Sequence, residues 1–211
     1  MRWIFLVLAG FGLVACQSQP QPVAPPSIST SIVVLPVQAK AGSIKLSGEY
    51  APRGDWESAI EDHLTSALID ALKALGIGVS APSLAVPKEV SLRAEMVLPQ
   101  ANAFRELPTA DSADEWSVGA LPLSDQIVLL TVHETELKTG GHQIAQIGLG
   151  LSFANPRLPE RGDTVTYLAL VEGDTGTLIW TAQLSGGDAR TPENAAALAA
   201  RLAPLLQGQT P

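Results

Sequence analysis

Short apolar runs bounded by polar residues predict strands in the first part of the chain. Residues 32–37 read Ile-Val-Val-Leu-Pro-Val, a β-branched run that is typical of a strand covered on both faces. Residues 77–79 predict a second short strand. Residues 43–50 alternate loosely between apolar and polar side chains, which fits an edge strand or an ordered loop.

A helix is predicted between these strands, because apolar residues recur there every three or four positions. Asp55 stands where an N-cap would begin this helix, and Gly76 stands where a left-handed glycine would end it. The predicted apolar stripe comprises Ile60, Leu64, Ala67, Leu68, Ala71, Leu72 and Leu75.

The middle of the chain has a weaker pattern. Residues 90–98 alternate in part and fit a strand, whereas residues 99–122 leave room for at most a short helix. We therefore expect residues 82–124 to form an irregular insert in the domain.

Strand patterns return in the C-terminal half. Residues 126–134 contain a continuous apolar run typical of a buried strand, and residues 147–153 alternate apolar side chains with glycine and serine. Residues 164–172 and 177–185 flank the sequence Gly-Asp-Thr-Gly at 173–176, which predicts a β-hairpin.

The last predicted element is a helix that starts at Thr191. Thr191 is suited to cap it, Pro192 to its first position and Glu193 to its first turn. Pro204 is expected to kink or end this helix before residue 206. Together the elements predict an α+β fold, a mixed sheet of about five to six strands with helices packed on one face.

The N-terminal segment predicts export and lipidation. Residues 3–14 form an uncharged apolar run after Arg2, shorter than the roughly 20 residues that span a bilayer but typical of a secretory signal. The run ends in Leu-Val-Ala-Cys, which resembles the lipobox of bacterial lipoprotein signal peptides. The resemblance implies cleavage between Ala15 and Cys16, lipidation of Cys16, and sorting to the outer membrane because Gln17 is not Asp. The alternative is a chance cysteine after an ordinary signal peptide.

A tether is predicted between the anchor and the domain. Residues 17–31 carry no charge and four prolines, a composition that favours extended polyproline II and a reach of about 45 Å. We therefore expect a signal peptide at 1–15, a lipidated cysteine and proline-rich linker at 16–31, and a single α+β domain at 32–206 facing the periplasm.

Charge and cysteine content exclude several classes of partner and site. The chain has 13 Lys and Arg against 21 Asp and Glu, and its formal net charge is −8. This balance argues against nucleic acid as a partner, because phosphate binding needs clustered basic residues. A single cysteine excludes an intramolecular disulfide and a thiolate metal cluster. With no P-loop, dinucleotide fingerprint or nucleophile elbow, we expect no cofactor and no catalytic residue.

One motif suggests proteolysis. Asp174-Thr175-Gly176 matches the short signature of aspartic proteases, whose mechanism needs two carboxylates that share a proton. The chain contains no second copy of the motif. Asp and Gly are also the residues that a turn between two strands requires, so a turn is the simpler interpretation.

A second group of residues suggests a metal site. His133, Glu134 and Glu136 lie close together in the sequence, and His142 follows a Gly-Gly turn. On a strand, however, His133 faces one side of the sheet and both glutamates face the other, whereas zinc needs converging ligands. We therefore predict a solvated strand end and no metal.

Gly148 and Gly150 lie on the bare face of the strand predicted at 147–153. Small residues let another backbone approach closely, either within the chain or between copies of it. These two glycines are therefore a candidate oligomer face.

Several segments resemble one group of envelope lipoproteins. The first strand ending in Leu-Pro, the strand at 125–132 and above all the hairpin of residues 168–180, followed by a closing helix, carry the likeness. They are similar to lipoproteins with a fold like the TolB amino-terminal domain, a group that includes CsgG, PelC and LpoB. The resemblance covers roughly residues 31–80 and 125–206, and it implies fold and compartment more than task.

Two classes of function follow. We expect a non-enzymatic lipoprotein, anchored to the outer membrane, that serves as a scaffold or accessory factor for an export or cell-wall machine. Its partners would be the membrane, through the lipid anchor, and envelope proteins or further copies of itself. The alternative is a periplasmic hydrolase of the aspartic-protease type that uses Asp174.

Overall fold

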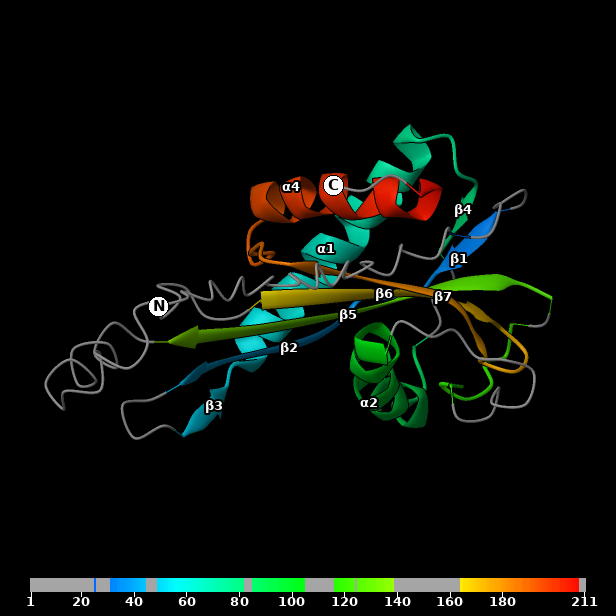
Figure 1. The fold of residues 1–211 in the computed structure, drawn as a ribbon. Coiled ribbons are helices and arrows are strands. Elements are labelled where there is room, and N and C mark those ends of the chain that lie inside the picture. The colour runs from blue at the N-terminus through cyan, green and yellow to red at the C-terminus, as the bar shows by residue number, and fades with distance from the viewer. Residues whose placement is uncertain are drawn as a thin grey trace, which may run out of the picture.

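A mixed β-sheet with helices on both faces forms the body of the protein (Figure 1). The computed structural model describes residue 25 and residues 31–44, 49–81, 85–104, 116–123, 125–138 and 164–208. The described strands are β1 (Ile32–Val34), β2 (Gln38–Ile44), β3 (Tyr50–Pro52), β4 (Val79–Ser80), β5 (Ile127–Lys138), β6 (Thr164–Glu172) and β7 (Leu178–Ser185). The described helices are α1 (Gly54–Ala74), α2 (Lys88–Phe104), α4 (Pro192–Leu202) and the short 3-10 helix η3 (Ala203–Gln207).

The long strand β5 lies at the centre of the sheet. On one side it pairs in parallel with β1 near its start and with β2 along the rest of its length. On the other side it pairs antiparallel with β6, and β7 pairs antiparallel with β6. The short strands β4 and β3 add to β1 and β2 at the opposite edge. These pairings confirm the mixed sheet and the α+β class, with seven described strands where about five to six were expected. The expectation that helices pack on one face alone is wrong, because α2 covers the face opposite α1 and α4.

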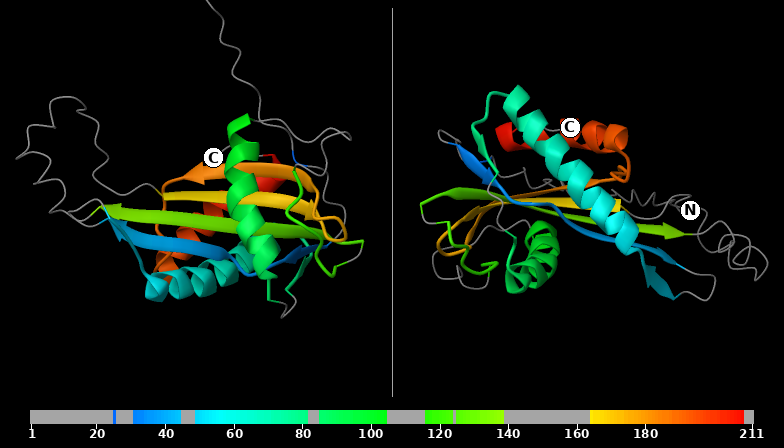
Figure 2. Two further views of the ribbon diagram at one scale, coloured as in Figure 1. Left: turned by 90° about the horizontal axis from the view of Figure 1, so that it is seen from below. Right: turned by 180° about the vertical axis from the view of Figure 1, so that it is seen from behind.

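Helices α1 and α4 cover one face of the sheet and contact each other (Figure 2). The predicted apolar stripe of α1 is confirmed, because the four side chains at four-residue spacing are all buried. Leu198 and Leu202 of α4 join them in the larger of two cores, above Leu129 of β5 and Leu168 of β6. The buried stripe of α1 comprises Ile60, Leu64, Leu68 and Leu72.

Helix α2 covers the other face of the sheet, where it crosses the strands (Figure 2). The sequence pattern led us to expect a strand at 90–98 inside an irregular insert, and that expectation is wrong for residues 88–104. The reason is a helical stripe that packs against the even-numbered side chains of β5 in a second core. The stripe comprises Val90, Ala94, Val97, Leu98 and Ala101.

Of the two predicted helix N-caps, the one of α4 is confirmed and the one of α1 is wrong. Thr191 caps α4 as predicted, because its hydroxyl accepts a hydrogen bond from the Asn194 amide at 3.4 Å. Asp55 does not cap α1: the N-cap is Arg53, two residues earlier, and Asp55 lies in the first turn of the helix. There the Asp55 carboxylate accepts two hydrogen bonds from the Arg53 guanidinium, at 2.9 and 2.7 Å. Pro204 ends α4 as expected, in the first turn of η3.

Candidate functional site

One end of the sheet face beneath α1 and α4 is polar. Side chains alternate between the two faces of a strand, and on β5 the odd-numbered ones face these helices. Leu129 is apolar, but the next three odd positions are Thr131, His133 and Thr135. On the neighbouring strand β6, Thr166 pairs with His133 and Thr164 pairs with Thr135. The two strands therefore present a patch of threonines around one histidine.

His133 lies at the centre of this patch and is fully buried. Its Nδ1 atom is 2.9 Å from the hydroxyl oxygen of Thr166. Its Nε2 atom and the Thr131 hydroxyl have no hydrogen-bond partner among the described residues. Burial lowers the pKa of His133 from 6.5 to about 4, and the negative charge of Asp188 opposes part of that change. The imidazole is therefore neutral at neutral pH.

The buried position of His133 corrects one prediction and confirms another. The strand end is not solvated at this residue, since His133 has no exposed surface. The predicted divergence of the side chains is confirmed, because His133 contacts Thr166 on the α1 side while Glu134 lies near Lys40 and Glu95 on the α2 side.

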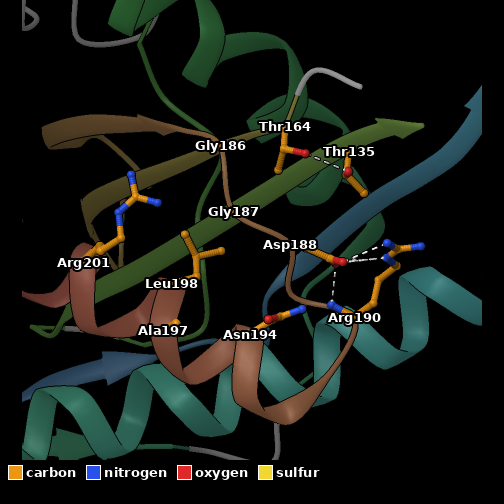
Figure 3. A pocket seen from close by; sticks show the side chains of 10 residues that line it. All are labelled: Thr135, Thr164, Gly186, Gly187, Asp188, Arg190, Asn194, Ala197, Leu198 and Arg201. Carbon is orange, nitrogen blue, oxygen red and sulfur yellow. Dashed lines mark hydrogen bonds and ion pairs between the residues drawn. The ribbon is translucent and has the colours of Figure 1, made fainter. Parts of the chain in front are cut away.

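A pocket of about 690 Å³ opens beside the patch, between the ends of β5, β6 and β7 and helix α4 (Figure 3). Thr135 and Thr164 line one side of it, with their hydroxyl oxygens 2.9 Å apart. Arg201 and the Asp188–Arg190 pair lie at opposite ends of it (Figure 3). The polar lining residues are Thr135, Thr164, Asp188, Arg190, Asn194 and Arg201.

Two glycines shape the connection from β7 to this pocket. Gly186 and Gly187 both have positive φ values, 76° and 112°, which favour glycine. A Cβ atom on Gly187 would also lie 2.8 Å from the Leu198 side chain of α4. The chain can therefore pass close to α4 before it reaches Asp188.

Arg190 joins several elements at the edge of the pocket. Its guanidinium donates to both carboxylate oxygens of Asp188, at 2.8 to 3.1 Å, and lowers the pKa of that carboxyl. The same guanidinium lies 4.8 Å from the ring centre of Trp56, and Arg53 lies 4.2 Å from it. The Arg190 carbonyl accepts a hydrogen bond from His63 Nδ1 at 3.1 Å. Asp188 is thus held as a paired carboxylate, and α1 is linked to the start of α4.

A smaller polar cluster lies on the α2 side of the sheet. Lys40 and Glu95 form an ion pair at 3.9 Å, and Glu134 is half-buried near them. Burial raises the pKa of Glu134, Lys40 opposes that change, and the nearby Glu95 and Glu136 add to it. Burial also raises the pKa of Tyr167.

Asp174 lies exposed in the turn between β6 and β7. Gly176 follows with a φ of 68°, and its amide donates to the Glu172 carbonyl at 2.7 Å, so the motif closes a hairpin turn as the simpler interpretation predicted. The Thr175 hydroxyl donates to the Glu172 side chain at 3.1 Å.

Several predicted residues lie outside the described part of the chain. They are Ala15 and Cys16 at the predicted cleavage site, the candidate oligomer face at Gly148 and Gly150, and His142. Among the described residues, no three His, Cys, Asp or Glu side chains come together as a metal ion would require. None of the described helices is both long enough and apolar enough to cross a bilayer.

The acid, the histidine and the two threonines at and beside the pocket are paired or buried. Asp188 is paired with Arg190, and His133 is neutral and has no exposed surface. The Thr135 and Thr164 hydroxyls bond to each other rather than to a base.

No family model matches the sequence, and no curated protein matches it. Among solved structures, the chain is similar to a dodecamer of a PelC point variant from Paraburkholderia phytofirmans, with 13% sequence identity and a TM-score of 0.38. That match covers 89% of this chain and 96% of the other.

Proposed function

We propose that the protein is a non-enzymatic scaffold of the bacterial envelope, anchored by lipid on Cys16 to the outer membrane and facing the periplasm. The observation that carries the proposal is the sequence Leu-Val-Ala-Cys at 13–16, which closes the uncharged apolar run that begins at residue 3. Stable attachment needs more than one acyl chain, and lipidation at such a site supplies them.

The sequence and the fold support a docking role. Residues 17–31 supply an uncharged, proline-rich tether between the anchor and the domain. Both faces of the sheet are covered by helices, and the acid in the pocket is paired. The protein would act by holding envelope proteins or further copies of itself at the membrane, as part of an export or cell-wall machine.

Lipid attachment is tested by fractionation of cells that produce the full-length protein. We expect the wild type in the membrane fraction, and Cys16→Ser in the soluble periplasmic fraction or retained as uncleaved precursor. Ser18→Ala is the matched control, because it changes a nearby hydroxyl without touching the lipidation site. Wild-type protein in the soluble fraction would overturn the proposal.

The choice of membrane is tested separately. Asp directly after the lipidated cysteine is the residue whose absence implied outer-membrane sorting, so Gln17→Asp is expected to move the protein to the inner-membrane fraction of a density gradient. Gln17→Asn is the matched control and should stay in the outer membrane. Identical fractionation of wild type and Gln17→Asp would contradict the proposed location.

The absence of catalysis is tested at the hairpin turn. Asp174→Asn keeps the size and turn preference of the side chain but removes a carboxylate that an aspartic protease requires. We expect cells that carry this variant to behave as wild type. A loss of function at normal protein level would favour the hydrolase instead.

A further inference from the structure

The two edges of the sheet differ in length. At one edge, β4 has two residues, and β3 has three and ends in Pro52. At the other edge, β7 runs for eight residues, from Leu178 to Ser185. Short strands and proline are among the means by which proteins prevent edge pairing with other chains. The β7 edge lacks both.

Among the described residues, nothing pairs with the backbone groups on the outer side of β7 after its first residues. The Gly186 amide donates to the Thr164 carbonyl of β6 at 2.7 Å, which fixes the alternation along the strand. Thr181 and Gln183 occupy the alternate positions, so their backbone N–H and C=O groups point away from β6. Among the described residues, no backbone partner from another element reaches either position.

Described residues of other elements occupy the start of this edge alone. The Leu178 amide donates to the Trp116 carbonyl at 3.2 Å, and Thr177 forms an isolated bridge with Ser117. Beyond that point β7 continues to Ser185, with Gln183 and Ser185 exposed. The free stretch is therefore long enough for several ladder hydrogen bonds.

The edge also lacks the charges that usually protect such strands. No Asp, Glu, Lys or Arg occurs between residues 175 and 187, although the whole chain carries a net charge of −8. Two copies of this acidic chain would repel each other over most of their surfaces. They can meet here without bringing like charges together.

We propose that a second copy of this chain pairs with it along β7, antiparallel and about a two-fold axis near residues 182–183. Among the described strands, β7 is the one edge long enough to pair, since β3 and β4 at the opposite edge have three and two residues. Two copies joined through this one edge form a closed dimer. The result is a dimer with one continuous sheet. The proposal rests on the scaffold role above and identifies the surface by which one copy of the scaffold binds another.

The test uses charge at Gln183, whose side chain is exposed. In either register the two Gln183 side chains lie directly opposite or one diagonal apart, within roughly 8 Å of each other. Gln183→Lys and Gln183→Glu therefore each place like charges together in a homodimer. An equimolar mixture of the two variants places opposite charges together.

The measurement is the oligomeric state of the full-length lipoprotein in detergent, by light scattering with size exclusion. We expect a wild-type dimer, at least tenfold weaker dimerisation for each charged variant, and recovery of the dimer in the mixture. Gln100→Lys, the same change at an exposed position of α2, should dimerise as wild type.

Four outcomes would overturn the proposal. They are a wild-type monomer, a Gln183→Lys variant that dimerises as tightly as wild type, a mixture that does not recover, and a dimer weakened instead by Gln100→Lys. The last would point to the exposed Leu92 and Met96 of α2 as the contact. Because the readout is in detergent, failure of dimerisation and failure of membrane anchoring are distinguishable.

Discussion

The sheet face beneath α1 and α4 has two contrasting ends, although the same two strands build both. At one end Leu129, Leu168 and Leu170 are fully buried against the helices. At the other end His133 and Thr166 are equally buried, but they bond to each other through a single side-chain contact. Burial alone therefore does not distinguish the ends.

What distinguishes them is the energetics of the buried atoms. Apolar burial contributes stability in proportion to the area removed from water, whereas a buried polar atom costs free energy unless it has a partner. Two atoms at the polar end, His133 Nε2 and the Thr131 hydroxyl, have no such partner among the described residues. We expect the apolar end to contribute more to the free energy of unfolding than the polar end. We expect the contribution of the polar end to depend on pH.

The largest expected loss of stability comes from a substitution at the apolar end. Leu168→Ala should lower the free energy of unfolding by about 2–5 kcal/mol, because it leaves a cavity in the main core. Thr164→Ala at the polar end should cost only about 0.5–1.5 kcal/mol, for one lost hydroxyl contact. Urea denaturation of both variants measures the difference, and equal losses would contradict the contrast.

The next effect is a pH dependence that belongs to the polar end. Because burial lowers the pKa of His133 to about 4, the unfolded chain binds a proton below pH 6.5 that the folded chain does not. His133 should therefore leave stability unchanged above pH 6.5 and remove up to about 3 kcal/mol as the pH falls from 6.5 to 4. The comparison is with His133→Gln, which cannot titrate, and indistinguishable pH profiles would refute the assignment.

A smaller effect concerns α4, which lies over both ends. Thr191→Ala removes the hydroxyl that caps this helix and should cost about 0.5–1 kcal/mol. Thr191→Ser keeps the hydroxyl and should restore most of that stability. A thermal melt of the three proteins orders them, and a Ser variant as unstable as the Ala variant would argue against the cap.

The smallest effect concerns the partly exposed Asp188–Arg190 pair. Arg190→Lys retains the charge but loses the paired hydrogen bonds to Asp188 and the flat contact with Trp56. We expect a loss of well under about 1 kcal/mol, since solvent screens such pairs. Chemical denaturation at low and high salt tests this, and a loss of about 2 kcal/mol or more would mean that the pair acts as a buried one.

The elements with a regular pattern were predictable from the sequence. The stripe of α1, the β6–β7 hairpin and the Thr191 cap each depend on spacing within a few residues, which a sequence shows directly. The start of α1 could not be predicted from the sequence in this way, because Asp55 bonds to the neighbouring Arg53 instead of capping the helix.

Helix α2 and the burial of His133 were missed for a different reason. In α2 the exposed Leu92 and Met96 lie between buried residues of the stripe, so the sequence imitates the alternation of a strand. For His133 the strand pattern predicts which face it shares, but not which helices cover that face. The charges around Glu134 on the opposite face suggested solvent, whereas the threonines on either side of His133 were the signal of a half-polar interior.

The most direct test of the account is the intact mass of the protein purified from its native membrane. Lipid anchoring predicts a chain that starts at Cys16, carries a diacylglycerol on its sulfur and an acyl group on its amino terminus, and has no free thiol. A chain that retains residues 1–15, or one whose Cys16 reacts with a maleimide, would contradict the anchored scaffold.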